Sequence, residues 1–200
     1  MDVPFGPFLY YKKKNENTYL SAYEIVFITV TLLIVASIVW STLKVGISPM
    51  PSSAKAREVI IQLTVNTGTG PIVDLGSGWG SLIIPLAKKY PQRKIVGYEI
   101  SLTPWLITKL LKTIFSLNNL ELYRKDFLQE ELSSAEVLIC YLYPEGMKTL
   151  ANKLTLEKNT TRVLISNYFS LPSQQPEKTI QLDDFYKSPI YLYHLNSERE

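Results

Sequence analysis

Three alternate glycines follow an acidic residue in the stretch from Asp74 to Gly80, which reads Asp-Leu-Gly-Ser-Gly-Trp-Gly after an apolar pair. Glycine has no Cβ, so a turn between a strand and a helix can take positive φ angles there and approach a ligand closely. We expect the amides of this turn to face the carboxylate of S-adenosylmethionine. The three glycines, Gly76, Gly78 and Gly80, are therefore predicted to bind this cofactor.

The spacing of the glycines separates this turn from a dinucleotide-binding turn. A nicotinamide site would place its third glycine one residue later, in the pattern Gly-x-Gly-x-x-Gly, but Ser81 occupies that position. The spacing therefore weakens the nicotinamide interpretation. The alternative is an ordinary turn between a strand and a helix that binds no cofactor. The residues around the turn distinguish between these two interpretations.

A second carboxylate, Glu99, ends the next predicted strand, residues 94–99. Its separation from the glycine turn suits a βαβ unit, in which the two parallel strands end at the same edge of the sheet. A carboxylate at that edge can accept hydrogen bonds from both hydroxyls of a ribose. Glu99 is therefore predicted to hold the cofactor ribose, and a solvated glutamate at a strand end is the alternative.

A third carboxylate, Asp126, closes another predicted strand and is followed by Phe127. Its carboxylate would accept a hydrogen bond from the adenine amino group while the Phe127 ring packs on the adenine ring. In the alternative interpretation, Asp126 is a loop acid that pairs with Arg124 or Lys125.

Strands and helices alternate along the chain from about residue 52 onward. This order predicts a parallel sheet with right-handed crossovers, closed by an antiparallel hairpin, which is the α/β, Rossmann-like seven-strand sheet of class I methyltransferases. Ligands of such sheets bind beyond the carboxyl ends of the strands. Tyr141 to Pro144, at the end of the fourth strand, are expected there beside the cofactor. The predicted strands are residues 71–75, 94–99, 120–124, 137–142, 162–166, 179–182 and 190–194.

Four helices are predicted, one before the first strand and three between strands. One covers residues 54–63, one runs from the glycine turn to about Tyr90 with a bend at Pro85, and one opens at Pro144. The fourth has Thr103 as its N-cap, Pro104 at its first position and an apolar stripe at helical spacing. This stripe predicts a helix packed on the core; its residues are Ile107, Leu110, Leu111, Ile114 and Phe115.

Composition limits the other functions that the chain can have. The net charge of +3 comes from scattered basic residues, so no nucleic-acid partner is indicated. Cys140 is the single cysteine and lies in an apolar run, which predicts a small buried side chain in a reducing compartment. His194 is the single histidine, so no metal site is expected.

An uncharged run of nineteen residues from Ile25 to Leu43 precedes the α/β part. A helix of this length rises about 1.5 Å per residue and nearly matches the roughly 30 Å hydrocarbon core of a bilayer. We therefore predict a tail at 1–23, a transmembrane helix at 24–44, a linker at 45–51 and a methyltransferase domain at 52–200. A buried soluble helix and a cleaved signal peptide are the alternatives.

Basic residues flank the apolar run on both sides and do not fix its orientation. S-adenosylmethionine is made and kept inside the cell, so the domain after the helix is expected on the cytoplasmic side. The expected location is a single-pass protein of a bacterial inner membrane. The lipid bilayer and a membrane protein substrate are then the expected partners.

Several short motifs together resemble one group of enzymes. They are Pro49-Met50-Pro51, Asp74-Leu75-Gly76-Ser77-Gly78, Gly97-Tyr98-Glu99 with Pro104-Trp105-Leu106, Arg124-Lys125-Asp126, Tyr141-Leu142-Tyr143-Pro144 with Lys153-Leu154, Arg162-Val163-Leu164-Ile165-Ser166 and Leu171-Pro172. The stretch from Pro49 onward is similar to the small, membrane-anchored class I methyltransferases that modify lysines of the adenine nucleotide translocase and the ATP synthase c-subunit, and to their bacterial relatives. The resemblance implies a protein-lysine N-methyltransferase that uses S-adenosylmethionine.

The resemblance also implies roles for individual residues. The cofactor would be held by Asp74, Gly76, Ser77, Gly78, Glu99 and Asp126. Tyr143, Pro144 and Asn167 would shape the acceptor pocket, with Tyr143 orienting the amine or packing over the cofactor. Trp79 and Ser81 depart from the Asp and Arg that relatives carry around the third glycine, which leaves the substrate subclass open.

Three rival functions are open at this point. Methylation of adenine or of planar amides usually goes with Asn-Pro-Pro-Tyr or Asp-Pro-Pro-Tyr after the fourth strand, whereas this chain has Tyr141-Leu142-Tyr143-Pro144. A lipid or quinone-like acceptor fits the membrane helix equally well. An inactive membrane-anchored scaffold is the third possibility, and the retained Asp74 and Glu99 argue against it.

Overall fold

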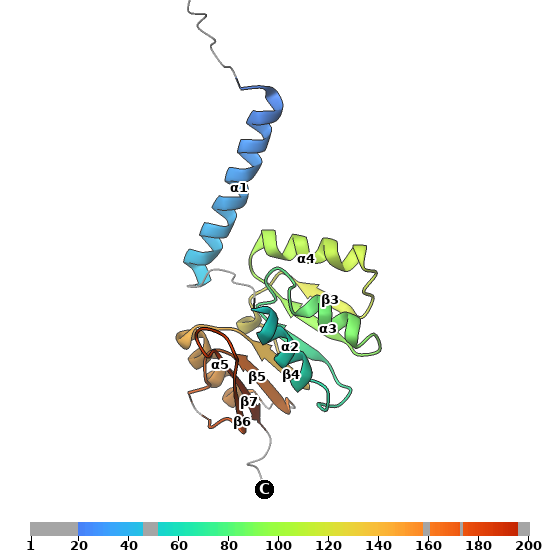
Figure 1. Cartoon of the computed structure of the whole chain (residues 1–200), viewed down its shortest axis with the longest axis vertical. Helices are drawn as coiled ribbons and strands as arrows, with labels where there is room; N and C mark the ends of the chain where they lie inside the picture. Colours follow the sequence, from blue (N-terminus) through green and yellow to red (C-terminus); the bar gives the residue numbers. More distant parts are fainter. Residues whose placement is uncertain (1–19, 46–51, 158–160, 173, 196–200) are drawn as a thin grey trace, which may run out of the picture. The chain divides into compact units, whose positions relative to one another are not determined.

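The computed structural model describes residues 20–45, 52–157, 161–172 and 174–195 (Figure 1). It divides into two compact units, residues 1–33 and 34–200, which are treated separately. The predicted N-terminal tail up to residue 19 and nearly all of the predicted linker, residues 46–51, lie outside the described residues, as does the Pro49-Met50-Pro51 motif.

The first helix, α1 (Ala22–Val45), is apolar around its circumference. Its segment Ala22–Trp40 has 19 residues with a mean hydropathy of 2.3, long and apolar enough to cross a membrane. The hydroxyls of Thr29 and Thr31 donate to the carbonyls of Ile25 and Phe27 at 2.8 Å, so these polar groups are satisfied within the helix.

Seven strands form one sheet in the order β3-β2-β1-β4-β5-β7-β6. Strands β1 to β5 are parallel to one another, and β7 runs antiparallel to both β5 and β6. The predicted seven-strand sheet with its closing hairpin is thus confirmed. The strands are β1 (Ile72–Leu75), β2 (Ile95–Tyr98), β3 (Leu120–Tyr123), β4 (Val137–Cys140), β5 (Val163–Asn167), β6 (Lys178–Gln181) and β7 (Pro189–His194).

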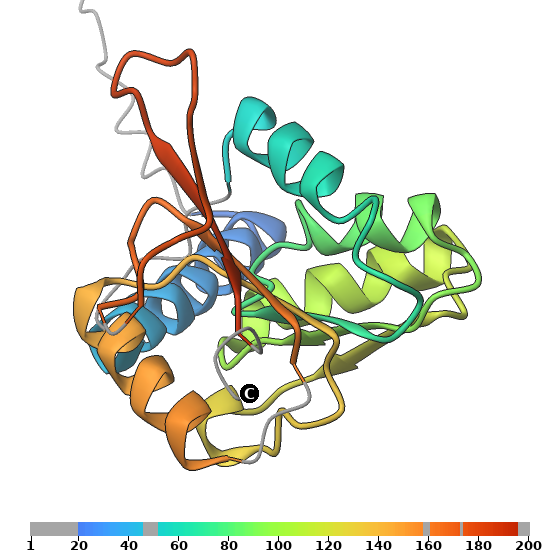
Figure 2. The same cartoon turned by 90° about the horizontal axis from the view of Figure 1, so that it is seen from below.

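Helices cover both faces of the sheet (Figures 1 and 2). Apolar residues of α2 (Ala54–Leu63) and α3 (Ile83–Lys89) join one buried cluster, and those of α5 (Pro144–Leu156) join the other. The central strands β1 and β4 are buried along their whole length because they are covered on both sides. A short 3₁₀ turn, η1 (Phe127–Gln129), follows β3.

Local sequence explains where two of these helices begin. The Ser53 side chain caps α2 by accepting from the amide of Ala56 at 3.1 Å. The helix after the glycine turn begins only at Ile83, so Pro85 lies in its first turn, where the amide that proline lacks has no partner within the helix. This start leaves Pro85 without the bending role that we predicted.

The helix α4 (Leu102–Ile114) differs most from its prediction. It begins after Ser101, not after Thr103, and the residues that it buries fully are Pro104 and Thr108. Of the predicted stripe, Leu111 packs against the core, whereas Leu110 and Ile114 are 60% and 61% exposed. The prediction of an apolar stripe packed on the core was therefore wrong, because the inward position is taken by the polar Thr108.

Candidate functional site

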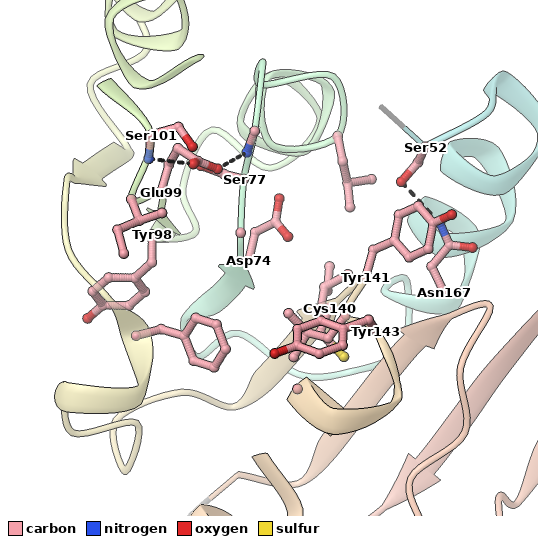
Figure 3. Close-up of a pocket in the computed structure, with 18 of the residues that line it drawn as sticks. Ser52, Asp74, Ser77, Tyr98, Glu99, Ser101, Cys140, Tyr141, Tyr143 and Asn167 are labelled. Atoms are coloured by element: carbon pink, nitrogen blue, oxygen red, sulfur yellow. Dashed lines mark hydrogen bonds between the residues drawn. The ribbon is translucent and has the colours of Figure 1, made fainter. Parts of the chain in front are cut away.

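A pocket of about 440 Å³ opens at the carboxyl ends of the strands (Figure 3). Gly80 and Pro144 are the two predicted site residues that are not part of its lining. The predicted residues that line it come from five parallel strands and the turns after them; they are Asp74, Gly76, Ser77, Gly78, Glu99, Asp126, Phe127, Tyr141, Tyr143 and Asn167.

The glycine turn is shaped by positive φ angles at Gly76 (97°) and Gly78 (51°). A Cβ at either residue would meet nothing within 4 Å and would project into open space. The amides behave differently from our expectation: those of Gly76 and Ser77 donate to the carbonyl of Tyr98 at 3.0 and 2.8 Å. The turn therefore presents its bare Cα atoms to the pocket, while these two amides tie it to β2.

Gly80 serves packing between elements. A Cβ at Gly80 would lie 2.8 Å from Cγ2 of Thr108, and its φ is 77°. The buried Thr108 hydroxyl lies 3.0 Å from the carbonyl of Gly78 and 3.0 Å from that of Pro104. Thr108 thus supports the turn from α4, a role that the apolar stripe beside it in the sequence did not reveal.

Glu99 is 7% exposed and accepts two main-chain hydrogen bonds. Its Oε2 accepts from the amide of Gly78 at 2.8 Å, and its Oε1 accepts from the amide of Ser101 at 2.7 Å (Figure 3). Each carboxylate oxygen can accept more than one hydrogen bond. Glu99 can therefore fasten the glycine turn to the start of α4 and still accept from a ligand hydroxyl.

Asp74 and Ser77 are buried beside Glu99. Burial raises the pKa of Asp74 to about 7, and the nearby charge of Glu99 contributes to this rise. The Ser77 Oγ atom is buried and has no hydrogen-bond partner in the described part of the chain. Positive charge on a ligand would favour the ionised form of Asp74, and a polar ligand group could bond to the unpaired Ser77 hydroxyl. These two side chains therefore indicate a ligand that brings both.

Asp126 lies at the pocket wall beside Phe127. Its Oδ1 accepts from the amide of Leu128 at 3.0 Å and so caps η1. Lys125 pairs with Glu130 at 2.9 Å. The alternative pairing of Asp126 with Lys125 is therefore not the arrangement in the structure, and the Asp126 carboxylate keeps capacity to accept from a ligand.

Aromatic side chains form the other wall of the pocket. The rings of Tyr141 and Phe169 are stacked with centroids 6.5 Å apart, and Tyr168 meets Phe169 edge-on at 5.0 Å. Burial raises the pKa of the Tyr141 hydroxyl. Tyr143, the N-cap of α5, also lines the pocket, and a Cβ on Gly146 would lie 3.3 Å from its ring.

Two residues of this wall were not predicted. Phe169 follows Tyr168, whose φ of 75° is unusual for a residue with a side chain. The buried Asn167 donates from its Nδ2 to the Oγ of Ser52 at 3.2 Å, and both residues line the pocket. Neither Phe169 nor Ser52 belongs to a sequence pattern that marks a site, and only the fold brings them there.

Cys140 also lines the pocket but is buried, as predicted. Burial raises the pKa of its thiol to about 12. The thiolate is the nucleophilic form of cysteine, so this residue is unreactive at neutral pH.

Sequence comparison places residues 74–178 in a described family, the ANTKMT methyltransferase domain. The chain is 27% identical over 140 residues to the lysine N-methyltransferase of the ATP synthase c-subunit from Mus musculus and 31% identical over 127 residues to the adenine nucleotide translocase lysine N-methyltransferase of that species. These matches cover 68% and 62% of this chain and 54% of each relative. The chain thus spans about half the length of these relatives.

A smaller relative matches over nearly its whole length. It is a protein-lysine N-methyltransferase of Saccharolobus islandicus, 23% identical over 154 residues that cover 75% of this chain and 94% of the relative.

Among solved structures, an RNA methyltransferase of Salinibacter ruber in complex with S-adenosyl-L-homocysteine superposes with a TM-score of 0.65. It is 23% identical, and the match covers 76% of this chain and 97% of that one. Magnesium protoporphyrin IX methyltransferase of Synechocystis PCC 6803 with bound S-adenosylmethionine gives a TM-score of 0.56 at 18% identity, covering 88% of this chain and 98% of that one. At such identities the superpositions show a shared fold.

Proposed function

The chain belongs to the ANTKMT methyltransferase domain family, and from this premise we propose that it transfers a methyl group from S-adenosylmethionine to a lysine side chain of a membrane-associated protein. The main observation behind this proposal is that one pocket has an acidic wall and an aromatic wall. The acidic wall consists of Asp74, Glu99 and Asp126, and the aromatic wall of Tyr141, Tyr143 and Phe169. The acidic wall suits the cofactor and the aromatic wall suits the acceptor lysine, and methyl transfer requires the two to be adjacent.

The acidic wall fits the cofactor. The pocket volume lies within the range of about 300 to 1,000 Å³ of ligand pockets, and the open space above Gly76 and Gly78 would be filled by any side chain. Glu99 would accept from ribose hydroxyls, Asp126 from the adenine amino group, and Asp74 would face the positive charge of the amino-acid end. The unpaired Ser77 hydroxyl would gain a partner there.

When bound, the cofactor supplies a methyl group on a cationic sulfur, and its transfer to an amine nitrogen leaves a neutral thioether. The protein mainly has to align the acceptor with this carbon. Aromatic faces attract cations, so the aromatic wall suits the charged end of a lysine side chain.

The lysine amine must lose its proton before it can attack. With a reference pKa near 10.4, deprotonation at pH 7 costs about 4 to 5 kcal/mol, and a buried position next to positive charge lowers that cost. Tyr143 is the residue that we assign to orient the neutral amine, with Asn167 shaping the slot beside it. Pro144 is the first residue of α5 and directly follows Tyr143, the N-cap of this helix.

The membrane location rests on α1 and on the relatives. The helix meets the length and hydropathy of a single membrane span, and two relatives are named for lysine methylation of the ATP synthase c-subunit and of the adenine nucleotide translocase. We propose that the domain lies on the side of the membrane where S-adenosylmethionine is made, the cytoplasm, and that the membrane is a bacterial inner membrane.

The test is a labelling experiment with the full chain in detergent. The protein is incubated with S-adenosylmethionine carrying a labelled methyl group and with solubilised membrane proteins and lipids, which are then separated. The proposal expects label in a protein, and mass spectrometry should place it on lysine Nζ.

The control is a Glu99→Gln variant, compared with Glu58→Gln, a change at an exposed glutamate on α2. Glu99→Gln should abolish most of the labelling while Glu58→Gln leaves it unchanged. Label in the lipid extract would show the rival small-molecule activity. Cofactor binding without any label in protein or lipid would favour the inactive scaffold.

A further inference from the structure

The exposed face of α4 is the largest feature that the methyltransferase site does not explain. Its apolar side chains repeat at helical spacing and point away from the core. Together they form the α4 apolar face, which consists of Leu102 (43% exposed), Leu106 (49%), Ile107 (39%), Leu110 (60%) and Ile114 (61%). A contiguous exposed apolar patch usually marks an interaction site.

Lysines border this face. The helix carries Lys109 and Lys112 and has no acidic residue. The Lys109 ammonium lies 4.8 Å from the ring of Trp105, and the Lys88 ammonium of α3 lies 3.2 Å from the ring of Phe115, just after the helix. Leucine, isoleucine and tryptophan edged by lysine are typical of helices that lie in the interface of an anionic membrane.

The chain that joins the domain of α4 to α1 is short. The six residues between Val45 and Ser52 can extend at most about 25 Å, whereas a compact domain of this size is about 40 Å across. If α1 spans the bilayer, as proposed above, the attachment point of the domain stays within about 25 Å of the end of α1. A domain held this close presents its exposed apolar surface to lipid at high local concentration.

The attachment point lies at the same edge of the sheet as the start of α4. Ser52, where the described domain begins, and Ser101, the N-cap of α4, both line the cofactor pocket. A bilayer near Ser52 is therefore also near the first turn of α4, and it would bring the pocket mouth toward residues at the membrane surface.

From these observations we infer that the α4 apolar face docks on the headgroup region of an anionic phospholipid membrane. The inference rests on the proposed membrane anchor and adds a second contact between the domain and the lipid. This contact would orient the pocket toward acceptor lysines close to the bilayer.

Site-directed labelling of the full chain in vesicles tests this docking. Cys140 is the single cysteine and is buried, so the environment-sensitive fluorophore bimane can be attached to Leu110→Cys alone. Leu156→Cys is the matched control, because Leu156 is an 85% exposed apolar residue at the end of α5. Leu33→Cys reports on insertion of α1. The vesicles contain phosphatidylcholine mixed with phosphatidylglycerol, with and without nitroxide-labelled lipid.

We expect nitroxide lipid to quench the label at position 110 several-fold more than the label at 156, with soluble iodide showing the reverse order. Leu106→Glu, an exposed change on the same face, should reduce lipid quenching at 110, and so should vesicles of phosphatidylcholine alone. Equal lipid quenching at 110 and 156 overturns the inference. Shielding of 110 from both quenchers also overturns it, because protein then covers the face.

The label at position 33 separates this inference from the anchor on which it rests. Strong lipid quenching at 33 without quenching at 110 would leave the anchor in place and refute docking of α4. Absence of quenching at both positions would refute the anchor and, with it, the docking. Cofactor binding and methyl transfer are not measured by this experiment, so their outcome stays independent.

Discussion

Replacement of Asp74 by asparagine should change the stability of the ligand-free protein in a way that depends on pH. Relative to the wild type, the variant should gain unfolding free energy as the pH rises. Asp74 is buried, and its pKa of about 7 lies well above the value near 3.9 of an unfolded aspartate. A raised acid pKa means that the folded state binds the proton more tightly than the unfolded state. The wild type therefore loses stability as pH rises through this window, until the folded carboxyl is ionised above pH 7.

The size of the effect follows from the two pKa values. Because only the unfolded state ionises readily, the Asp74 carboxyl lowers the unfolding free energy by about 1 to 2 kcal/mol at pH 5 and by about 4 kcal/mol at pH 8, relative to strongly acid pH. The unfolding free energy of Asp74→Asn minus that of the wild type should thus increase by roughly 2 to 3 kcal/mol between these pH values. Any constant cost of the asparagine amide cancels in this comparison.

Urea unfolding of the full chain in detergent, without cofactor, measures this difference at several pH values by tryptophan fluorescence. Glu58→Gln, at an exposed position, is the control and should show a difference from wild type that does not change with pH. A flat difference for Asp74→Asn would refute the reasoning, and a decrease with pH would show that Asp74 is stabilised as an anion in the folded protein.

Three further changes probe the pocket from different elements. Gly78→Ala places a Cβ in the open pocket at a φ of 51°. It should cost about 1 kcal/mol of unfolding free energy and weaken cofactor binding, measured by calorimetry, about tenfold or more. An unchanged affinity for the cofactor would contradict the role of this turn. Thr108→Val removes the hydroxyl near the Gly78 carbonyl and should lower the free energy of unfolding in urea by about 1 kcal/mol. Its control, Thr113→Val on the exposed side of α4, should leave that free energy nearly unchanged. Equal losses in the two variants would argue against support of the turn by Thr108. Tyr143→Phe should reduce turnover far more than cofactor affinity in steady-state assays paired with a binding titration, and a parallel loss of both would show that Tyr143 packs on the cofactor.

The strands and the family could be predicted because their signals are local. Runs such as Val137 to Cys140 are apolar on both faces, and the glycines between Asp74 and Gly80 mark the turn that follows a central strand. The order of elements then fixes the sheet, since right-handed crossovers leave few arrangements. The expected family is confirmed by the match over residues 74–178.

The failures share one physical cause, which is that the neighbours of a residue are set by tertiary packing. Helical periodicity identified the apolar stripe on α4 but did not show which side faces the sheet. Thr108 takes the inward position, where it lies close to Gly80. In the site, Glu99 was predicted to contact the ligand, yet its two main-chain bonds to Gly78 and Ser101 depend on a turn and a helix start that meet only in the fold.

The central claim is that the pocket around Glu99 and the glycine turn binds S-adenosylmethionine. Titration calorimetry with S-adenosylhomocysteine, the demethylated product, tests it most directly on the full chain, with circular dichroism to verify folding of each variant. We predict saturable binding to the wild type, unchanged binding to Glu58→Gln, and binding weakened by about tenfold or more in Glu99→Gln, since a charged hydrogen-bond acceptor is lost. No binding heat with the wild type, or equal affinities of the two variants, would contradict the account.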